Sequence, residues 1–226
     1  MKKRGSSFLN EEECSMCTIH TYGSPKAPVT LLQCIESRDL PSMESELAAI
    51  RTLTNADFQL IALQVEDWNR DLSPWPAPAV FGKEGFAGGA DKTLAALLPL
   101  CQDKSKRYIL GGYSLAGLFA LWAACQTDAF DGIVAASPSV WFPDFVPYMK
   151  EHPIKSDAVY LSLGDREPKT RNPVMATVGD CLEACRGMLT EQGTPCTLEW
   201  NQGNHFQEPD ARTAKGFAWV MKQLRL

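Results

Sequence analysis

The segment that most restricts what this chain can fold into is a serine flanked by glycines between two apolar runs. Residues 108–113 read Tyr-Ile-Leu-Gly-Gly-Tyr, which is typical of a buried strand, and residues 115–125 are typical of an apolar helix. Ser114 stands between them, and Gly112 and Ala116 lie where larger side chains would crowd a tight turn. A strand, a sharp serine turn and a helix form a nucleophile elbow. The pattern therefore indicates a serine held for nucleophilic attack, with an ordinary serine on a glycine-rich turn as the alternative.

Length and charge narrow the class of protein. A chain of 226 residues can bury a substantial core, and we expect one domain over residues 1–226. The net charge is −5, and Lys2-Lys3-Arg4 is the one basic cluster, so we expect no nucleic-acid partner. No apolar run approaches the ~20 residues that span a bilayer, and the basic N-terminus leads into polar residues. We therefore expect a soluble, cytoplasmic protein without a membrane partner.

The eight cysteines do not predict a metal site. Cys14-Ser-Met-Cys17 has the spacing of half a zinc site or of a redox pair, but the sequence contains no second such pair to complete it. Five further cysteines lie at apolar strand or helix positions, where cysteine behaves as a small hydrophobic residue in a reducing compartment. They are Cys34, Cys101, Cys125, Cys181 and Cys185. We expect ordinary thiols and no metal or other cofactor.

Strands and helices alternate along the chain. Residues 18–22 and 29–35, joined by a Gly-Ser-Pro-Lys turn, predict an antiparallel hairpin. Alternation of apolar strands with helices predicts a mostly parallel sheet with helices on both faces. The long aromatic and proline-rich stretch at 66–89 is typical of a functional wall or lid. Further strands are expected at 58–65, 132–136, 158–164 and 196–200, and helices at 43–53, 92–101, 115–125, 178–189 and 208–224.

A nucleophilic serine needs a histidine base, and the sequence offers three. His20 lies on the first strand, before the serine, and His152 stands in a charged stretch typical of a solvated loop. His205 follows an apolar strand and precedes the last helix, at the strand end where active-site loops of an open α/β sheet gather. Position, chain order and elimination of the others favour His205.

A third residue, an acid, is expected on a loop after a strand, between serine and histidine. Two carboxylates follow the strand at 158–164. A buried acid there would orient the imidazole and stabilise the imidazolium. Glu167 is our first choice and Asp165 the alternative. If both are surface charges beside Arg166 and Lys169, a serine–histidine dyad remains.

Five segments in order carry a family resemblance: 69–74 (Asn-Arg-Asp-Leu-Ser-Pro), 86–91 (Phe-Ala-Gly-Gly-Ala-Asp), 112–117 (Gly-Tyr-Ser-Leu-Ala-Gly), 136–141 (Ala-Ser-Pro-Ser-Val-Trp) and 203–206 (Gly-Asn-His-Phe). Over most of its length the chain resembles the esterase family of the α/β-hydrolase superfamily that includes enterochelin and trilactone siderophore esterases, S-formylglutathione hydrolases and mycolyltransferases. The resemblance implies an α/β-hydrolase fold with Ser114 as nucleophile and His205 as base, and it places the acid near Glu167.

The chain departs from the family at the oxyanion hole. Family members commonly carry an Asp-Gly or His-Gly pair after the third strand, whereas this chain reads Cys34-Ile-Glu-Ser-Arg38 and lacks the glycine. The N–H of Leu115 remains one natural donor, and Ser37 or Arg38 is expected to supply the second. We also expect no large cap domain, and hence an open, shallow pocket.

These expectations define a function. We expect a serine hydrolase that cleaves a carboxylic ester, such as a small acyl ester or a siderophore lactone, through an acyl-enzyme and without a cofactor. The alternatives are an acyltransferase that uses the same acyl-enzyme, or a catalytically silent member that binds a ligand or partner. The sequence indicates no oligomeric state. Aromatic side chains expected to wall the pocket, if they are not core residues, are Trp68, Trp75, Tyr113, Trp141 and Phe142.

Overall fold

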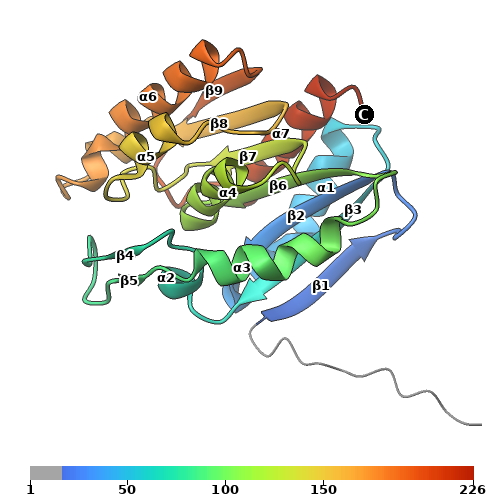
Figure 1. The fold of residues 1–226 in the computed structure, drawn as a ribbon, viewed down its shortest axis with the longest axis horizontal. Coiled ribbons are helices and arrows are strands. Elements are labelled where there is room, and N and C mark those ends of the chain that lie inside the picture. The colour runs from blue at the N-terminus through green and yellow to red at the C-terminus, as the bar shows by residue number, and fades with distance from the viewer. Residues whose placement is uncertain (1–16) are drawn as a thin grey trace, which may run out of the picture.

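A seven-stranded sheet forms the centre of the structure, a computed structural model that describes residues 17–226 (Figure 1). The strand order is β1-β3-β2-β6-β7-β8-β9, with β1 antiparallel to β3 and the other neighbours parallel. The expected mostly parallel sheet with an antiparallel N-terminal strand is confirmed. The strands are β1 (Cys17–Gly23), β2 (Val29–Ile35), β3 (Phe58–Val65), β6 (Arg107–Tyr113), β7 (Gly132–Ala136), β8 (Ala158–Gly164) and β9 (Cys196–Asn201).

Helices cover both faces of the sheet, and a separate apolar core lies on each face. Helices α1 and α7 lie behind the sheet in Figure 1, and α3 and α4 lie in front of it. Helix α4 is apolar on all sides and is buried over nearly its whole length, which is why it occupies the middle of its layer. The helices are α1 (Met43–Leu53), α2 (Trp68–Asp71), α3 (Ala90–Leu97), α4 (Leu115–Gln126), α5 (Phe145–Glu151), α6 (Val178–Glu191) and α7 (Pro209–Gln223).

The expected N-terminal hairpin is wrong. β1 pairs with β3, and β2 lies between β3 and β6. All seven residues of β2 are buried, so this strand needs neighbours on both edges and helices on both faces. β1 alternates between exposed and half-buried positions, which suits the edge of the sheet. The turn after β1 therefore carries the chain past β3 to the interior.

Other expectations concern single segments. The stretch at 66–89 carries α2 and a separate pair of two-residue strands, β4 (Pro76–Ala77) and β5 (Phe86–Ala87). Cys34, Cys101, Cys125 and Cys185 are buried in the core. Cys14 and the basic cluster at 2–4 lie outside the described residues. Among residues 17–226, no helix combines the length and the apolar character needed to cross a membrane.

Helix α4 begins directly after β6, and the crossing requires a close backbone approach. A Cβ added to Gly112 would lie 2.6 Å from the Cβ of Ala116 and 2.7 Å from its carbonyl oxygen. Only a residue without a side chain fits there unless the helix moves. The small residues on either side of Ser114 thus set the angle at which β6 meets α4.

We predict that Gly112→Ala lowers the free energy of unfolding by about 1 to 3 kcal/mol, because overpacking forces the backbone of α4 to shift. Gly187 in α6 is the matched control, because a Cβ there meets nothing within 4 Å. Gly187→Ala should raise stability by about 0.5 to 1 kcal/mol through helix propensity. Urea unfolding of the two variants measures both changes, and an equal effect at the two sites would contradict the packing argument.

Candidate active site

Ser114 occupies a strained turn between β6 and α4. Its φ of 58° and ψ of −122° are unusual for a residue with a side chain. Two backbone hydrogen bonds hold this conformation: the Ser114 N–H donates to the Ala136 carbonyl at 3.1 Å, and the Ser139 N–H donates to the Ser114 carbonyl at 3.0 Å. The end of β6 is thereby tied to the end of β7, and the Ser114 hydroxyl faces a cavity.

His205 lies in the loop between β9 and α7 and contacts both Ser114 and Glu167. Its Nε2 is 3.0 Å from Ser114 Oγ, and its Nδ1 is 2.7 Å from Glu167 Oε2. Because Nδ1 donates to the carboxylate, Nε2 of a neutral ring accepts the hydroxyl proton of Ser114. The three side chains come from the carboxyl ends of β6, β8 and β9, so the topology brings together residues that are distant in sequence.

Glu167 is buried, and donors surround its carboxylate. Oε1 accepts hydrogen bonds from Ser137 Oγ at 2.7 Å, from the Gly164 N–H at 2.7 Å and from Arg212 Nη1 at 3.2 Å. Burial by itself raises the pKa of this carboxyl, but the interactions with His205, Ser137 and Gly164 outweigh burial, and the pKa lies below its usual value. The carboxylate is therefore charged at neutral pH.

Arg212 and Ser137 were not identified from the sequence. Arg212, on α7, is 1% exposed, and its guanidinium also donates to Ser137 Oγ, to Tyr113 OH and to the Gln202 carbonyl. The sequence does contain an indication that Arg212 is buried, because it stands on the apolar face of the last helix among the buried residues of that face. Ser137 lies in the segment 136–141 noted above, but its role depends on a positive φ of 43° that the sequence does not reveal.

Asp165, the alternative acid, lies elsewhere in the site. Its carboxylate accepts the Gly203 N–H at 2.7 Å, and its own N–H donates to the Asn201 carbonyl at 2.8 Å. These bonds shape the loop that carries His205. The other histidines are also apart from Ser114: His20 bonds to Gln64 at the sheet edge, and His152 stacks on Tyr148.

The cavity beside Ser114 has a volume of about 590 Å³ and includes three of the expected aromatic residues, Trp68, Tyr113 and Trp141, in its lining. Trp75 is not part of that lining. Its indole N–H donates to the Pro143 carbonyl at 3.1 Å, and its ring packs on Phe142 and Tyr148, so it acts as a packing residue. The cavity reaches buried residues and is therefore deeper than the shallow pocket we expected.

Of the expected oxyanion donors, Arg38 lines the same cavity, and Leu115 directly follows Ser114 in the chain. Leu115 is the first residue of α4, so its N–H has no acceptor within the helix. Arg38 lies in the 3₁₀ turn Ser37–Ser42 that follows β2, and it lines the cavity. The Glu36 N–H is bound to the Asp39 carboxylate at 2.8 Å, which fixes the start of that turn. Within residues 17–226, no group of three or more His, Cys, Asp or Glu side chains is arranged to hold a metal ion.

The lowered pKa of Glu167 predicts how Ser137→Ala changes stability. A carboxyl whose pKa is lowered on folding stabilises the native state above its unfolded pKa of about 4.3, and this stability is lost as pH falls through the native pKa. Removing the Ser137 donor raises the native pKa, so acid unfolding should begin at a higher pH. At pH 7 the free energy of unfolding should fall by about 1.5 to 3 kcal/mol.

Ser156→Ala is the control, because Ser156 is also buried but its hydroxyl has no hydrogen-bond partner among residues 17–226. We expect a change within about 1 kcal/mol and an unchanged midpoint of acid unfolding. Circular dichroism between pH 2 and pH 8 gives both midpoints. Identical midpoints for the two variants would show that Ser137 does not hold the charge on Glu167.

Comparisons with known proteins identify solved structures that share the fold of this chain. No protein-family model matches the chain, and no curated protein matches it by sequence. Among solved structures, the siderophore hydrolase EstA from Aspergillus nidulans is 18% identical with a TM-score of 0.64, and the match covers 97% of this chain and 99% of that chain. EstB, a siderophore hydrolase from the same organism, is 15% identical with a TM-score of 0.68 over 100% and 99% of the two chains. An IroE-like serine hydrolase from Shewanella oneidensis is 17% identical with a TM-score of 0.69 over 87% and 70%. The chain therefore has the α/β-hydrolase fold of these proteins, as the family resemblance implies.

Proposed function

We propose that this protein is a serine hydrolase that cleaves a carboxylic ester through an acyl-enzyme. The observation that carries the proposal is the unbroken series of contacts from Ser114 Oγ to His205 Nε2 at 3.0 Å and from His205 Nδ1 to Glu167 Oε2 at 2.7 Å. A hydroxyl is a weak nucleophile until a base takes its proton, and this arrangement supplies the base and the group that orients it.

In the first half of the reaction, Ser114 Oγ attacks the ester carbonyl while His205 Nε2 takes the hydroxyl proton. The imidazolium that forms is stabilised by the Glu167 carboxylate. His205 then gives the proton to the leaving alkoxide, and the alcohol departs. In the second half, His205 takes a proton from water as the water oxygen attacks the acyl group. His205 then returns this proton to Ser114 Oγ as the bond between Oγ and the acyl carbon breaks, which releases the carboxylic acid.

The negative charge that develops on the carbonyl oxygen needs donors that are already in place. We assign one donor to the N–H of Leu115, at the N-terminus of α4, where the helix dipole adds to the attraction. We assign the second to Ser37 or Arg38, whose turn is fixed by the bond between Glu36 and Asp39. This turn takes the place of the Asp-Gly or His-Gly pair that is common in the family that the chain resembles.

The substrate we propose is an ester with an apolar or aromatic part beside its carbonyl. Aromatic and thioether side chains line one part of the cavity, among them Phe81, Trp141, Met175 and Phe206. Such a surface favours flat or apolar groups. Two solved structures with the same fold are described as siderophore hydrolases, so a siderophore ester belongs to the substrates to be tried first.

We predict that a fluorophosphonate probe labels the protein once, on Ser114. Ser114→Ala and His205→Ala should lose the labelling, and each should lower kcat for p-nitrophenyl acetate or butyrate by about 10⁴-fold or more, because the nucleophile and its base act as one unit. Intact-mass measurement and peptide mapping identify the labelled residue. A folded wild-type protein that is neither labelled nor active would contradict the proposal.

A second pair of variants tests which carboxylate is the acid. Glu167→Gln removes the charge beside His205 and should lower kcat by about 10⁴-fold. Asp165→Asn keeps an oxygen that can accept the Gly203 N–H, so we expect kcat to change by less than about tenfold. Near-UV circular dichroism confirms that both variants are folded. A larger loss in Asp165→Asn would assign the acid to Asp165.

A further inference from the structure

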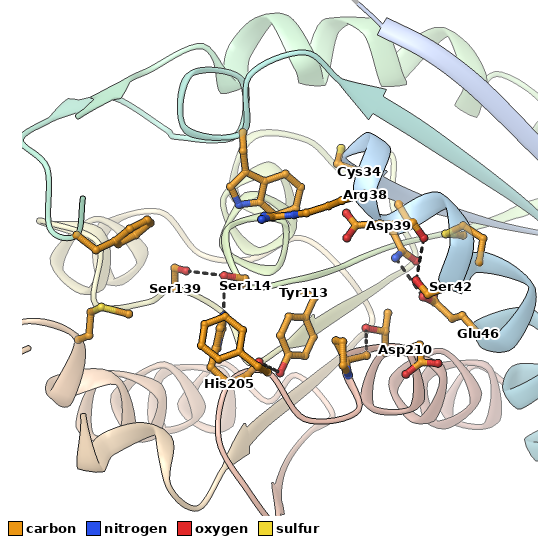
Figure 2. A pocket seen from close by; sticks show the side chains of 18 of the residues that line it. Cys34, Arg38, Asp39, Ser42, Glu46, Tyr113, Ser114, Ser139, His205 and Asp210 are labelled. Atoms are coloured by element: carbon orange, nitrogen blue, oxygen red, sulfur yellow. Dashed lines mark hydrogen bonds between the residues drawn. The ribbon is translucent and has the colours of Figure 1, made fainter. Parts of the chain in front are cut away.

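The cavity continues beyond Ser114 into a region lined by carboxylates. We call this region the acidic side and define it by Asp39, Glu46 and Asp210, all of which line the cavity. Figure 2 shows these three residues on one side of Ser114 and Ser139 on the other. The mechanism proposed above uses neither Glu46 nor Asp210, and it uses Asp39 only through its bond to the Glu36 N–H. They come from the turn after β2, from α1 and from the start of α7.

Glu46 is the buried member of the acidic side, with 3% of its surface exposed. Its Oε2 accepts a hydrogen bond from Gln33 Nε2 at 3.3 Å. Its Oε1 has no hydrogen-bond partner among residues 17–226, and the same is true of Gln33 Oε1. Two buried oxygens beside the cavity thus have no partner among the described residues, which costs free energy unless a ligand pairs with them.

The neighbouring side chains offer further acceptors. The Ser42 hydroxyl donates to the Asp39 carbonyl and the Thr213 hydroxyl donates to the Pro209 carbonyl, both at 2.8 Å. Each hydroxyl proton is thus committed, and only lone pairs remain for a ligand. Asp210 Oδ2 accepts the Ser45 hydroxyl at 2.7 Å, which leaves its other oxygen available.

Among the described residues that line the cavity, no Lys or Arg side chain is left unpaired to compensate the charge of the acidic side. Arg38 lines the cavity, but its guanidinium is paired with Glu36, and its side chain is 73% exposed. The pKa of Glu46 is raised to about 8, mainly by burial. The charges of Asp210 and Asp39 also raise it, whereas the hydrogen bond from Gln33 lowers it. A cation bound here would reverse that shift by pairing with the carboxylate.

We propose that the acidic side binds a protonated primary amine of the substrate, with Glu46 as its main partner. A primary ammonium has three N–H donors and no acceptor, which complements a set of acceptors without a free cation. A hydroxyl would satisfy one acceptor without favouring the charged form of Glu46, whereas an ammonium pairs with the carboxylate that forms when Glu46 loses its proton. That the amine belongs to an ester substrate rests on the proposed function. That the acidic side binds an amine does not depend on that function.

Calorimetry with n-hexylammonium chloride and 1-hexanol at pH 7 tests the site, because the two probes differ in charge and not in chain length. We expect hexylammonium to bind the wild-type protein more tightly than hexanol does. Glu46→Gln should weaken hexylammonium binding by about 10- to 100-fold and leave hexanol unchanged. The variant should fold, because glutamine has the same shape and lacks the charge that burial disfavours.

Glu44→Gln is the matched control, since Glu44 is an exposed residue on the same helix and the substitution is the same. It should bind hexylammonium as the wild type does. Equal affinity of the wild type for the two probes would overturn the proposal, as would equal affinity of Glu46→Gln and the wild type for hexylammonium.

Competition locates the amine. Hexylammonium should inhibit hydrolysis of p-nitrophenyl acetate competitively, with an inhibition constant equal to its Kd, because Ser114 and Glu46 line one cavity. Noncompetitive inhibition would place the amine elsewhere and overturn the proposal. If the wild type does not hydrolyse the ester, the proposed function fails, and the calorimetric comparison still decides whether Glu46 holds an amine.

Discussion

The carboxylate of Glu167 is the group on which the arrangement of the site depends. A charged carboxylate is stable in the interior only when hydrogen bonds and a compensating charge replace its lost hydration. Here the donors come from Ser137 after β7, from the backbone of Gly164 at the end of β8, and from Arg212 on α7, while the second oxygen contacts His205. One ion therefore fixes the relative positions of two strand ends, one loop and one helix.

Backbone strain beside this ion is held by the same strand ends. Ser114 and Ser137 both have positive φ, which costs about 1 to 3 kcal/mol for a residue with a side chain. Hydrogen bonds from Ser114 N–H to the Ala136 carbonyl and from Ser137 N–H to the Ser162 carbonyl join β6, β7 and β8 at their ends. The strained turns are thus embedded in a hydrogen-bonded part of the sheet, which holds Ser114 and the donors to Glu167 in position.

The parts of this site that follow from local sequence patterns could be predicted from the sequence. The parts that depend on the path of the chain and on which side chains face one another could not. The turn at Ser114 and the position of His205 after an apolar strand follow from chain order and from glycine sterics. Asp165 and Glu167 are two residues apart, and only the path of the chain after β8 decides which faces His205. The partner of β1 was predicted wrongly, because the short turn suggested a hairpin while the burial of β2 demanded a place between two strands.

Helix α7 connects the contacts around Glu167 to the acidic side of the cavity. It carries Arg212, which contacts Glu167, and two residues earlier it carries Asp210, which is bound to Ser45 on α1. Glu46 follows Ser45 on that helix, so a ligand held between Glu46 and Asp210 contacts the two helices that cover one face of the sheet. A displacement of α7 large enough to widen the acidic side would also withdraw Arg212 from Glu167, a buried contact that is costly to break. The buried contact between Arg212 and Glu167 therefore opposes a change in the width of this part of the cavity.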